Sequence, residues 1–533
     1  MKSASLFELL ALLSCAAAFT TEDNVVGLGF TVKRTPVDES HLGHMKRGSS
    51  GYIQAALANE VVQYFAAIEL GTPGQTQNVV LDTGSSDLWV MESSNPYCLG
   101  NSGDITTANQ VNCTGTSMFN QTASSSFVSN NTAFAIAYGD TTAANGTFAQ
   151  DDLSIGGVTV NMINFAVASS SNSTSPVFGV GPAWGQSTVM NVTADGVAYP
   201  TYTSIIQSMV GQGLIQSVAF SLWLNDINAD SGNILFGGVD TAKYSGDLIS
   251  MPIIVTLPSY SIPVQQALAN YVQMTGMGVT IANQTTSIAS GGFPVLLDSG
   301  TSLAYLPDEW VEALGTSIGG FYSEDLGLYV VDCDNNMADT VSFDLAGNSF
   351  PVSLEEMLFP VTDANGDSIL DGSGNALCGL GILGGGAYNV NATYILGDVF
   401  LRGAYVVYDY DTSEIAVAIA NLNETASSIV PISTGIPNAT PASSYNVTTF
   451  VSSFSTITGL ASGATSANVT SDIFSTDGVD GLVPVPTPTG AASATGDSTG
   501  TSNATGSASA TKNAAVKTGV IAGLGFYLLN MLL

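Results

Sequence analysis

The sequence predicts an almost wholly β protein in which two lobes each carry one aspartate loop. Many short apolar runs alternate with glycine-rich turns, which is typical of strands and hairpins. In addition, one segment occurs twice: residues 79–86 read Val-Val-Leu-Asp-Thr-Gly-Ser-Ser, and residues 295–302 read Val-Leu-Leu-Asp-Ser-Gly-Thr-Ser. The repeat indicates two equivalent halves, each of which delivers one carboxylate, Asp82 or Asp298.

Each copy is an apolar strand that ends in a tight turn, and its residue types suit a pair of facing carboxylates. Glycine lets the backbone approach the partner loop closely, and small hydroxyl side chains can donate hydrogen bonds inside the turn. A single Asp-Thr-Gly more often just closes a turn, but the duplication argues against that interpretation. Two carboxylates held together cannot both ionise easily, so they share a proton and can act as acid and base. The residues expected to support the pair are Thr83, Gly84, Ser85, Ser86, Ser299, Gly300 and Thr301.

Together with their flanks, these motifs resemble the pepsin family of aspartic endopeptidases, and the resemblance covers roughly Val62 to Ala420. The chain departs from compact family members in the longer spacing between the two aspartates and in an inserted stretch between Tyr97 and Ala123. Neither departure touches the motifs. The segments that carry the resemblance are residues 64–73, 86–90, 137–140, 177–181, 235–240 and 395–398.

The resemblance implies a bilobal pepsin-like fold with an active-site cleft between the lobes and a flap hairpin over it. Asp82 and Asp298 would activate a water molecule that adds to the peptide carbonyl, without a covalent enzyme intermediate. Tyr138, Gly139 and Asp140 would form the flap and bind substrate; Asp140 is either a solvated turn residue or a subsite for a basic side chain. Trp89 would support Tyr138 through its indole N–H. No metal or organic cofactor is implied, and we expect a monomer.

Histidine chemistry is excluded independently of the resemblance. The only histidines are His41 and His44, both upstream of the dibasic pair Lys46-Arg47. A processed chain that starts after this pair therefore has no histidine for a nucleophile triad or a zinc site. The stretch 363–374 only half resembles a calcium loop, because its sixth position is Ser368 and its twelfth is Gly374, so we interpret it as a solvated turn.

The excess of acidic residues predicts that the protein works at acidic pH. The chain has 9 Lys and Arg against 43 Asp and Glu, and only Lys243 and Arg402 lie in the predicted body. Such a body repels itself at neutral pH and loses most of its charge when the carboxylates become protonated. The acidic surface also argues against nucleic acid as a partner.

The N-terminal region is expected to be removed in two steps. Residues 1–18 are typical of a secretory signal peptide, and residues 19–47 are interpreted as a prosegment that a dibasic-cutting convertase releases after Lys46-Arg47. An ordinary exposed basic pair is the alternative. By resemblance to the family, either Lys33 or Lys46 would pair with the aspartates before cleavage.

Four cysteines remain once Cys15 leaves with the signal peptide. An even number in an exported chain implies disulfides, and four cysteines allow three connectivities. We expect one bridge in each lobe, Cys98 with Cys113 and Cys333 with Cys378.

The remaining chain divides into lobes at 48–240 and 241–425, a Ser/Thr/Pro-rich glycosylated stalk at 426–513, and a signal for a glycolipid (GPI) anchor at 514–533. A transmembrane helix is the alternative for the short apolar tail. Sequons are dense, so we expect a glycoprotein. The anchor candidates are Asn513, Ser507 and Gly506, and the sequons include Asn112, Asn120, Asn145, Asn391, Asn446 and Asn503.

Two functions remain open from the sequence. The first is an acid-active aspartic endopeptidase that passes through the secretory pathway, cleaves proteins and peptides, and is tethered to the plasma membrane or cell wall, which resembles the fungal yapsin-type proteases. The second is a catalytically silent pepsin-like cell-wall glycoprotein or adhesin. Two intact Asp-[Ser/Thr]-Gly turns and a flap tyrosine favour the enzyme.

Overall fold

The computed structural model describes the folded body and part of the N-terminal leader. The predicted signal peptide, the pair Lys46-Arg47, the anchor candidates and Asn391, Asn446 and Asn503 lie outside the described residues. The described residues are 19–21, 24–34, 37–38, 62–98, 110–140, 142–188, 191–193, 196–198, 201–254, 269–324, 326–334, 339–363, 367–385, 394–445 and 453–456.

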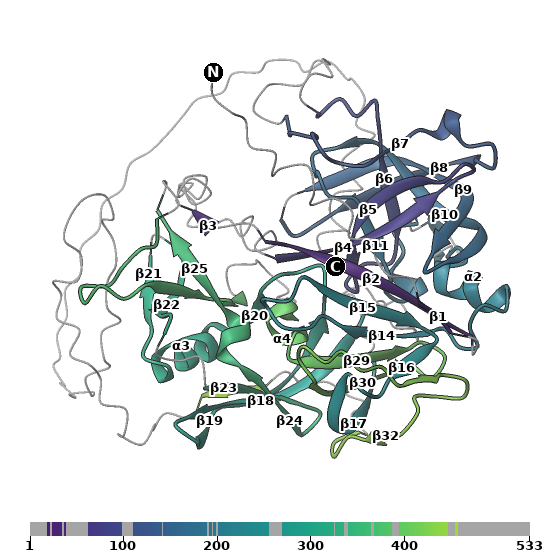
Figure 1. Ribbon diagram of the computed structural model, residues 1–533. Helices are drawn as coiled ribbons and strands as arrows, with labels where there is room; N and C mark the ends of the chain where they lie inside the picture. Colours follow the sequence, from purple (N-terminus) through teal and green to yellow (C-terminus); the bar gives the residue numbers. More distant parts are fainter. Residues whose placement is uncertain are drawn as a thin grey trace, which may run out of the picture.

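One large sheet runs through the molecule and is shared by both lobes (Figure 1). Its strands, in spatial order, are β32 (Ala439–Pro441), β17 (Tyr244–Pro252), β30 (Glu414–Ala420), β29 (Ala404–Asp409), β14 (Ala219–Trp223), β15 (Ser231–Phe236), β2 (Val25–Arg34), β4 (Val62–Leu70), β5 (Gln75–Asp82), β11 (Val177–Gly179), β6 (Leu88–Glu92), β10 (Val158–Ser171), β9 (Ala143–Ile155) and β8 (Val128–Ala137). Two short strands extend it, β1 (Phe19–Thr21) beside β2 and β7 (Met118–Phe119) beside β6.

The C-terminal lobe adds two further sheets, drawn in teal and green in Figure 1. The first has the order β24 (Asn348–Ser353), β23 (Thr340–Leu345), β18 (Tyr271–Ile281), β19 (Gln284–Leu297), β28 (Tyr394–Leu396), β20 (Ala304–Leu306) and β27 (Ile382–Gly384), with β33 (Ser453–Thr456) beside β19. The second has the order β21 (Phe321–Ser323), β22 (Leu328–Asp332), β26 (Leu377–Leu380), β25 (Leu358–Thr362) and β3 (Val37–Asp38). The all-β, two-lobed prediction is confirmed.

Helices are few and short in the described part of the chain. They are α2 (Ile205–Gly211), α3 (Asp308–Ser317), α4 (Asp398–Leu401) and the 3₁₀ turns η4 (Gln121–Ala123), η5 (Ala183–Gly185) and η6 (Leu354–Met357). The longest helix, α3, begins after Pro307 and buries Trp310 and Leu314. Two acidic residues in its first turn interact favourably with the positive end of the helix dipole. Among the described residues, no helix is long and apolar enough to cross a membrane.

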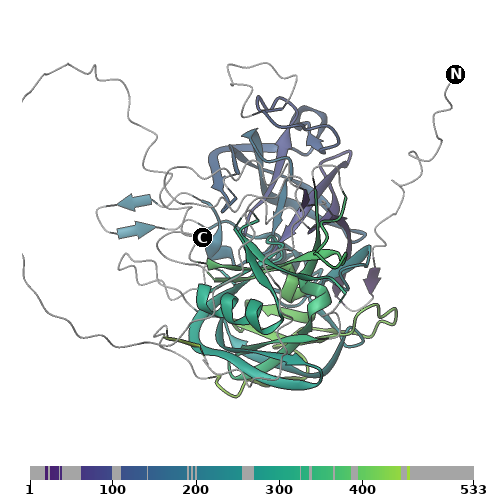
Figure 2. The same ribbon diagram turned by 90° about the vertical axis from the view of Figure 1, so that its left-hand side faces the viewer.

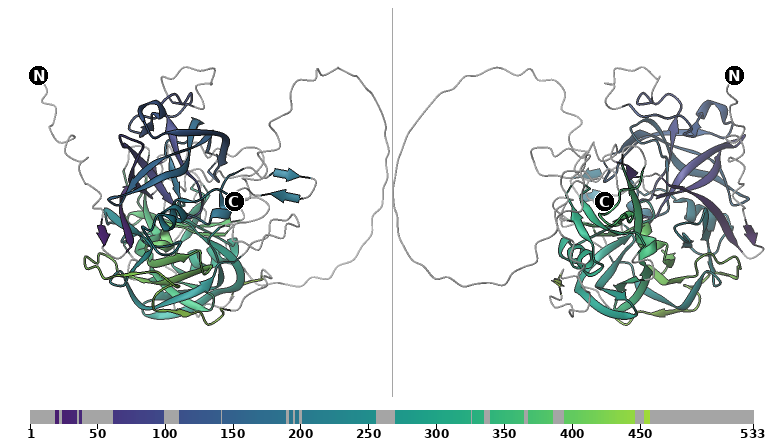
Figure 3. Two further views of the ribbon diagram at one scale, coloured as in Figure 1. Left: turned by 90° about the vertical axis from the view of Figure 1, so that its right-hand side faces the viewer. Right: turned by 60° about the vertical axis from the view of Figure 1, so that its left-hand side comes forward.

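The two predicted disulfides are present. Cys98 is bonded to Cys113 with Cα atoms 5.4 Å apart, and Cys333 is bonded to Cys378 with Cα atoms 5.0 Å apart. A separate hairpin, β12 (Asn191–Thr193) and β13 (Gly196–Ala198), projects from the body as the pair of blue arrows in Figures 2 and 3.

The leader is built into the body. Strand β2 lies in the predicted prosegment, yet it pairs with β15 on one side and with β4 on the other. Its side chains Val25, Val26, Leu28 and Phe30 are buried. Because β2 is hydrogen-bonded along both edges and its apolar side chains pack into the core, this part of the leader is an integral strand of the central sheet.

The body also extends beyond the predicted start of the stalk at residue 426. We call residues 421–445 the C-terminal strap. Within it, β31 (Ile429–Pro431) pairs with β16 (Gly238–Asp240), and β32 pairs with β17. The buried Ile432 anchors the strap in a small apolar cluster. The Ser/Thr-rich composition of this segment concealed its backbone pairing, so the structure places residues 426–445 with the folded body.

Candidate active site

Equivalent strands deliver the two aspartates. Asp82 is the last residue of β5, which runs parallel to β11, with Asp82 opposite Gly179. Asp298 follows β19, which runs parallel to β28 in the same way, with Leu297 opposite Leu396. The segments 177–179 and 394–396, both within the ranges or flanks that carry the family resemblance, therefore lie beside the two aspartate loops.

The loop around Asp82 satisfies both oxygens of its carboxyl group. Oδ1 accepts hydrogen bonds from the backbone N–H of Gly84 at 2.7 Å and of Ser85 at 3.2 Å, while Oδ2 accepts one from the Ser85 hydroxyl. The second loop repeats the pattern. Asp298 Oδ1 accepts from the N–H of Gly300 at 2.8 Å, and Oδ2 accepts from the Thr301 hydroxyl at 2.6 Å.

Hydroxyl side chains join the two loops across the pseudo-symmetric centre. The Thr83 hydroxyl donates to the carbonyl of Leu297, and the Ser299 hydroxyl donates to the carbonyl of Leu81, each at 2.9 Å. Each hydroxyl oxygen also accepts the N–H of the residue opposite, at 3.0 Å for the Ser299 N–H and 3.2 Å for the Thr83 N–H. These four hydrogen bonds hold the loops of the two lobes in one fixed relation.

The glycines allow the loops to approach each other. A Cβ atom on Gly84 would lie 2.5 Å from Cγ of Asp298, and one on Gly300 would lie 2.5 Å from Oδ1 of Asp82. Any larger residue at either position would collide with the opposite carboxyl group. The predicted need for glycine is therefore explained by close approach.

The site is electrostatically suited to share one proton. Asp82 and Asp298 are 6% and 8% exposed. Burial, the charge of Asp298 and a hydrogen bond between the two carboxyl groups together raise the pKa of Asp82, despite the opposing donors Ser85 and Gly84. One carboxyl group of the pair can therefore hold a proton at a pH where an isolated aspartate would be ionised.

The flap is the hairpin β8–β9. The indole N–H of Trp89 donates to the hydroxyl of Tyr138 at 2.7 Å, which is the contact predicted for this pair. At the tip, Asp140 Oδ1 accepts hydrogen bonds from the N–H and hydroxyl of Thr142, at 2.9 and 2.7 Å. Gly139 is exposed, and a Cβ atom there would meet nothing within 4 Å. One oxygen of Asp140 thus serves the turn.

Ser86 does not repeat the role of Ser85. It is buried with its hydroxyl against Gly181, just beyond β11, where a Cβ atom would lie 2.8 Å from Oγ. Of these two serines, Ser85 is the one whose hydroxyl donates to the Asp82 carboxyl group.

Asp87 and Tyr202 form a buried contact behind the first loop that sequence reasoning missed. Asp87 Oδ1 accepts from the Tyr202 hydroxyl and Oδ2 from the N–H of Ser187, both at 2.7 Å. The Tyr202 ring packs on Phe148 of the flap, with centroids 5.2 Å apart. Asp87 lies in the segment 86–90 that carries the family resemblance, but its partner Tyr202 is 115 residues away in the sequence. The sequence therefore did not indicate this contact.

A second group that the sequence did not identify lies behind the other loop. Arg402 is 2% exposed, and its Nε lies 2.9 Å from Oε2 of Glu356. Burial raises the pKa of Glu356 to about 7, although Arg402 opposes the change. Asp398 is also buried, its oxygens accept no hydrogen bond from the described residues, and its pKa is raised by burial and, further, by the charges of Asp298 and Asp82.

Comparison with known proteins decides the family. The model of the eukaryotic aspartyl proteases matches residues 63–420. The chain belongs to this family. The match contains both aspartate loops, the flap and the strands that carry them.

Several fungal aspartyl proteases are similar over most of their length. Aspartic proteinase MKC7 of Saccharomyces cerevisiae is 35% identical, over 77% of this chain and 74% of its own. Aspartic proteinase yapsin-3 of the same yeast is 36% identical over 76% and 75%. The probable aspartic-type endopeptidase opsB of Aspergillus oryzae is 34% identical over 87% and 88%.

A solved structure supports the fold of this aspartyl protease. The aspartic proteinase from Irpex lacteus matches with a TM-score of 0.50 at 18% identity, over 70% of this chain and 98% of its own. At that identity the likeness concerns the fold alone. The chain is thus an aspartic endopeptidase with a pepsin-like fold, similar to yapsin-type proteases.

Proposed function

We propose that Asp82 and Asp298 are the catalytic pair of an acid-active endopeptidase that works outside the cell. The observation that carries the proposal is the matched pair of loops, in which equivalent donors hold each carboxyl group and two glycines let them meet. Sharing of one proton between such carboxyl groups is the established behaviour of aspartic protease dyads, so it is expected here by family.

In the proposed reaction, the pair polarises one water molecule. The ionised carboxylate removes a proton as the water adds to the peptide carbonyl, and the protonated partner donates to the carbonyl oxygen. The carboxyl group that took the proton from water then passes it to the leaving amine. Asp82 and Asp298 thereby exchange the roles of acid and base. Because water is the nucleophile, no bond forms between enzyme and substrate.

Tyr138 would close over the substrate, and Trp89 would hold its hydroxyl in place. Their 2.7 Å hydrogen bond supports this role. The turn contacts of Asp140 use Oδ1 alone, so Oδ2 is compatible with a subsite for a basic side chain.

The cellular setting is also part of the proposal. The predicted signal peptide, leader, sequons, stalk and anchor signal together support export, release of the leader at Lys46-Arg47 by a convertase, and glycolipid tethering at the cell surface as a monomer. Lys33 lies over the ring of Phe65, with Nζ 5.9 Å from its centroid, so Lys46 is our candidate for the contact with the aspartates.

The mechanism is tested by rapid mixing of the processed enzyme with a peptide substrate in acid. We expect cleavage without a burst of the amine product, inhibition by a pepstatin-like transition-state mimic, and no acyl-enzyme by intact mass. A burst with a covalent adduct would contradict the water mechanism, because burst kinetics mark a covalent intermediate. Absence of cleavage at every pH would favour the silent glycoprotein.

A further inference from the structure

We infer that the turn Asp226–Asp230 is a guanidinium-binding site that latches the leader strand through Arg34 and shields the Lys33-Arg34 pair from proteolysis. We call this turn the arginine cradle. The inference rests on the proposed function in one respect, which is that a protease specific for basic residues removes the leader. The chain contains two dibasic pairs, Lys33-Arg34 and Lys46-Arg47. Of these, Lys33-Arg34 lies among the described residues.

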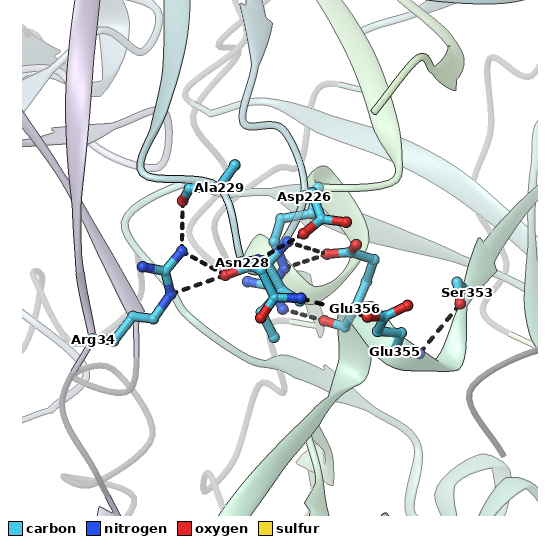
Figure 4. Close-up of polar contacts among 9 residues, drawn as sticks. Arg34, Asp226, Asn228, Ala229, Ser353, Glu355 and Glu356 are labelled. Carbon is cyan, nitrogen blue, oxygen red and sulfur yellow. Dashed lines mark hydrogen bonds and ion pairs between the residues drawn. The ribbon is translucent and has the colours of Figure 1, made fainter. Parts of the chain in front are cut away.

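Two of the three nitrogens of the Arg34 guanidinium donate hydrogen bonds to the cradle (Figure 4). Nε donates to the carbonyl of Ile227 at 2.9 Å, and Nη2 donates to the carbonyls of Ile227 and Ala229 at 2.6 and 2.5 Å. Nη1 lies 3.6 Å from Oδ1 of Asp230. A planar fork can reach these acceptors at once, whereas the single ammonium nitrogen of a lysine cannot.

The cradle is held in shape by the body. The N–H of Ala229 donates to the carbonyl of Asp226 at 2.9 Å, which closes the turn. The N–H of Ile227 donates to Oε2 of Glu356 at 2.9 Å, and Nε of the buried Arg402 donates to the same oxygen at 2.9 Å. The carbonyls of Ile227 and Ala229 therefore point at Arg34 from a supported turn, which lowers the entropic cost of binding a guanidinium.

Backbone pairing also restrains the main chain at Lys33 and Arg34, whose side chains are both exposed. In β2, Lys33 lies opposite Gln63 and Arg34 opposite Val62, and the N–H of Val32 donates to the carbonyl of Asp230 at 3.3 Å. After Arg34 the leader pairs again, as β3 beside β25 of the C-terminal lobe. Arg34 is thus held in a paired strand, and the chain is paired again from Val37.

A protease needs an extended and free segment, and its pocket for a basic side chain must receive Arg34. Both requirements demand local opening of β2 and release of the guanidinium, so the cleavage rate follows the population of the open form. Lys33-Arg34 is therefore a latent site. Hydrolysis there, in which one water supplies the new carboxylate of Arg34 and the new amine of Thr35, follows only after β2 leaves the sheet.

Limited trypsin digestion of the secreted Asp82→Asn proprotein tests the cradle, since this background prevents self-cleavage. Intact-mass spectrometry gives the rate of cleavage after residue 34. This rate is divided by the rate for the same chain when unfolded, so that the different preferences of trypsin for arginine and lysine cancel. We expect Arg34→Lys to raise this relative rate about tenfold or more, because it loses charge-assisted hydrogen bonds. Lys33→Arg is the matched control and should leave the rate unchanged.

Competition in solution provides a second measurement that needs no variant. Methylguanidinium should accelerate cleavage after residue 34 in the parent, whereas methylammonium at equal ionic strength should not. Equal rates for parent and Arg34→Lys, or no difference between the two cations, would overturn the role of the cradle. Failure of the proposed processing would appear separately, as no product cut after Arg47, and would leave this comparison intact.

Discussion

Among the described residues, neutral donors hold the two aspartates in place. Ser85 and Thr301 donate to the carboxyl groups, and Thr83 and Ser299 join the loops. Hydroxyl and amide donors orient a carboxyl group without fixing its charge. The pair therefore remains free to gain and lose the proton that the reaction moves.

The Trp89 to Tyr138 hydrogen bond gives a prediction at this scale. Trp89→Phe keeps an aromatic ring in the core but removes the donor, so the flap tyrosine loses its fixed position. We expect kcat/KM to fall about tenfold, close to the value of one hydrogen bond made in the working geometry. Steady-state kinetics on a peptide substrate measure it. Trp184→Phe, at a residue 37% exposed in η5, is the control and should keep parental kinetics.

At the scale of elements, the C-terminal strap stabilises the body through contacts with Lys243 and Asp240. Lys243 Nζ lies 4.2 Å from the centroid of the Trp223 ring and donates to the carbonyl of Glu424 at 2.5 Å. Asp240 accepts hydrogen bonds from the N–H of Ser428 and the hydroxyl of Ser427, each at 2.7 Å. The strap therefore covers apolar surface and satisfies buried polar groups.

Truncation tests this role. A chain that ends after Asn421 loses residues 422–445 of the strap and exposes the cluster around Ile432, so we expect its thermal midpoint to fall by about 1–2 °C or more, corresponding to at least about 1–2 kcal/mol in a body of this size. A chain that ends after Tyr445 keeps the strap and is the matched control, because both truncations lack β33. Differential scanning calorimetry gives both values. Equal midpoints for the two truncations would show that the strap contributes nothing.

These elements also mark the limit of prediction from sequence. Motifs that combine local turn chemistry with a repeat, such as 79–86 and 295–302, predicted the aspartate loops, the strands beside them and the bilobal fold. The place of β2 and of the strap depends on backbone pairing with distant strands, which leaves little trace in residue types. Arg34 likewise binds mainly carbonyl oxygens, which every residue possesses, so residue types gave little indication of the cradle.

For the whole molecule, the buried carboxyl groups determine the dependence of stability on pH. Burial raises the pKa values of Asp82, Asp87, Asp398 and Asp409, and that of Glu356 to about 7. A carboxyl group with a raised pKa in the folded state binds more protons there than in the unfolded chain. Its stabilising contribution is therefore full in acid and declines as the pH rises through the folded pKa.

We accordingly predict a higher thermal midpoint at about pH 4 than at about pH 8, where unperturbed carboxyl groups are ionised. Added salt should narrow the difference by screening repulsion between the many carboxylates. Glu356→Gln should narrow it further, because it removes a group that titrates near neutrality, whereas its neighbour Glu355→Gln should not. Calorimetry of the deglycosylated protein decides the sign. A protein more stable at the higher pH would show that hydrogen bonds to ionised carboxylates dominate.

The most direct test of the account is the activity of Asp82→Asn and Asp298→Asn measured separately at acidic pH. Each change keeps the size of the side chain but removes one of the two groups that exchange the proton, so each variant should lose at least about a thousandfold in kcat. Asp240→Asn, a buried aspartate that accepts hydrogen bonds from the strap, is the control, and calorimetry establishes that all three variants fold. Loss of activity in both loop variants, with the control active, is the predicted result. Parental activity in either Asp82→Asn or Asp298→Asn would contradict the assignment of the pair.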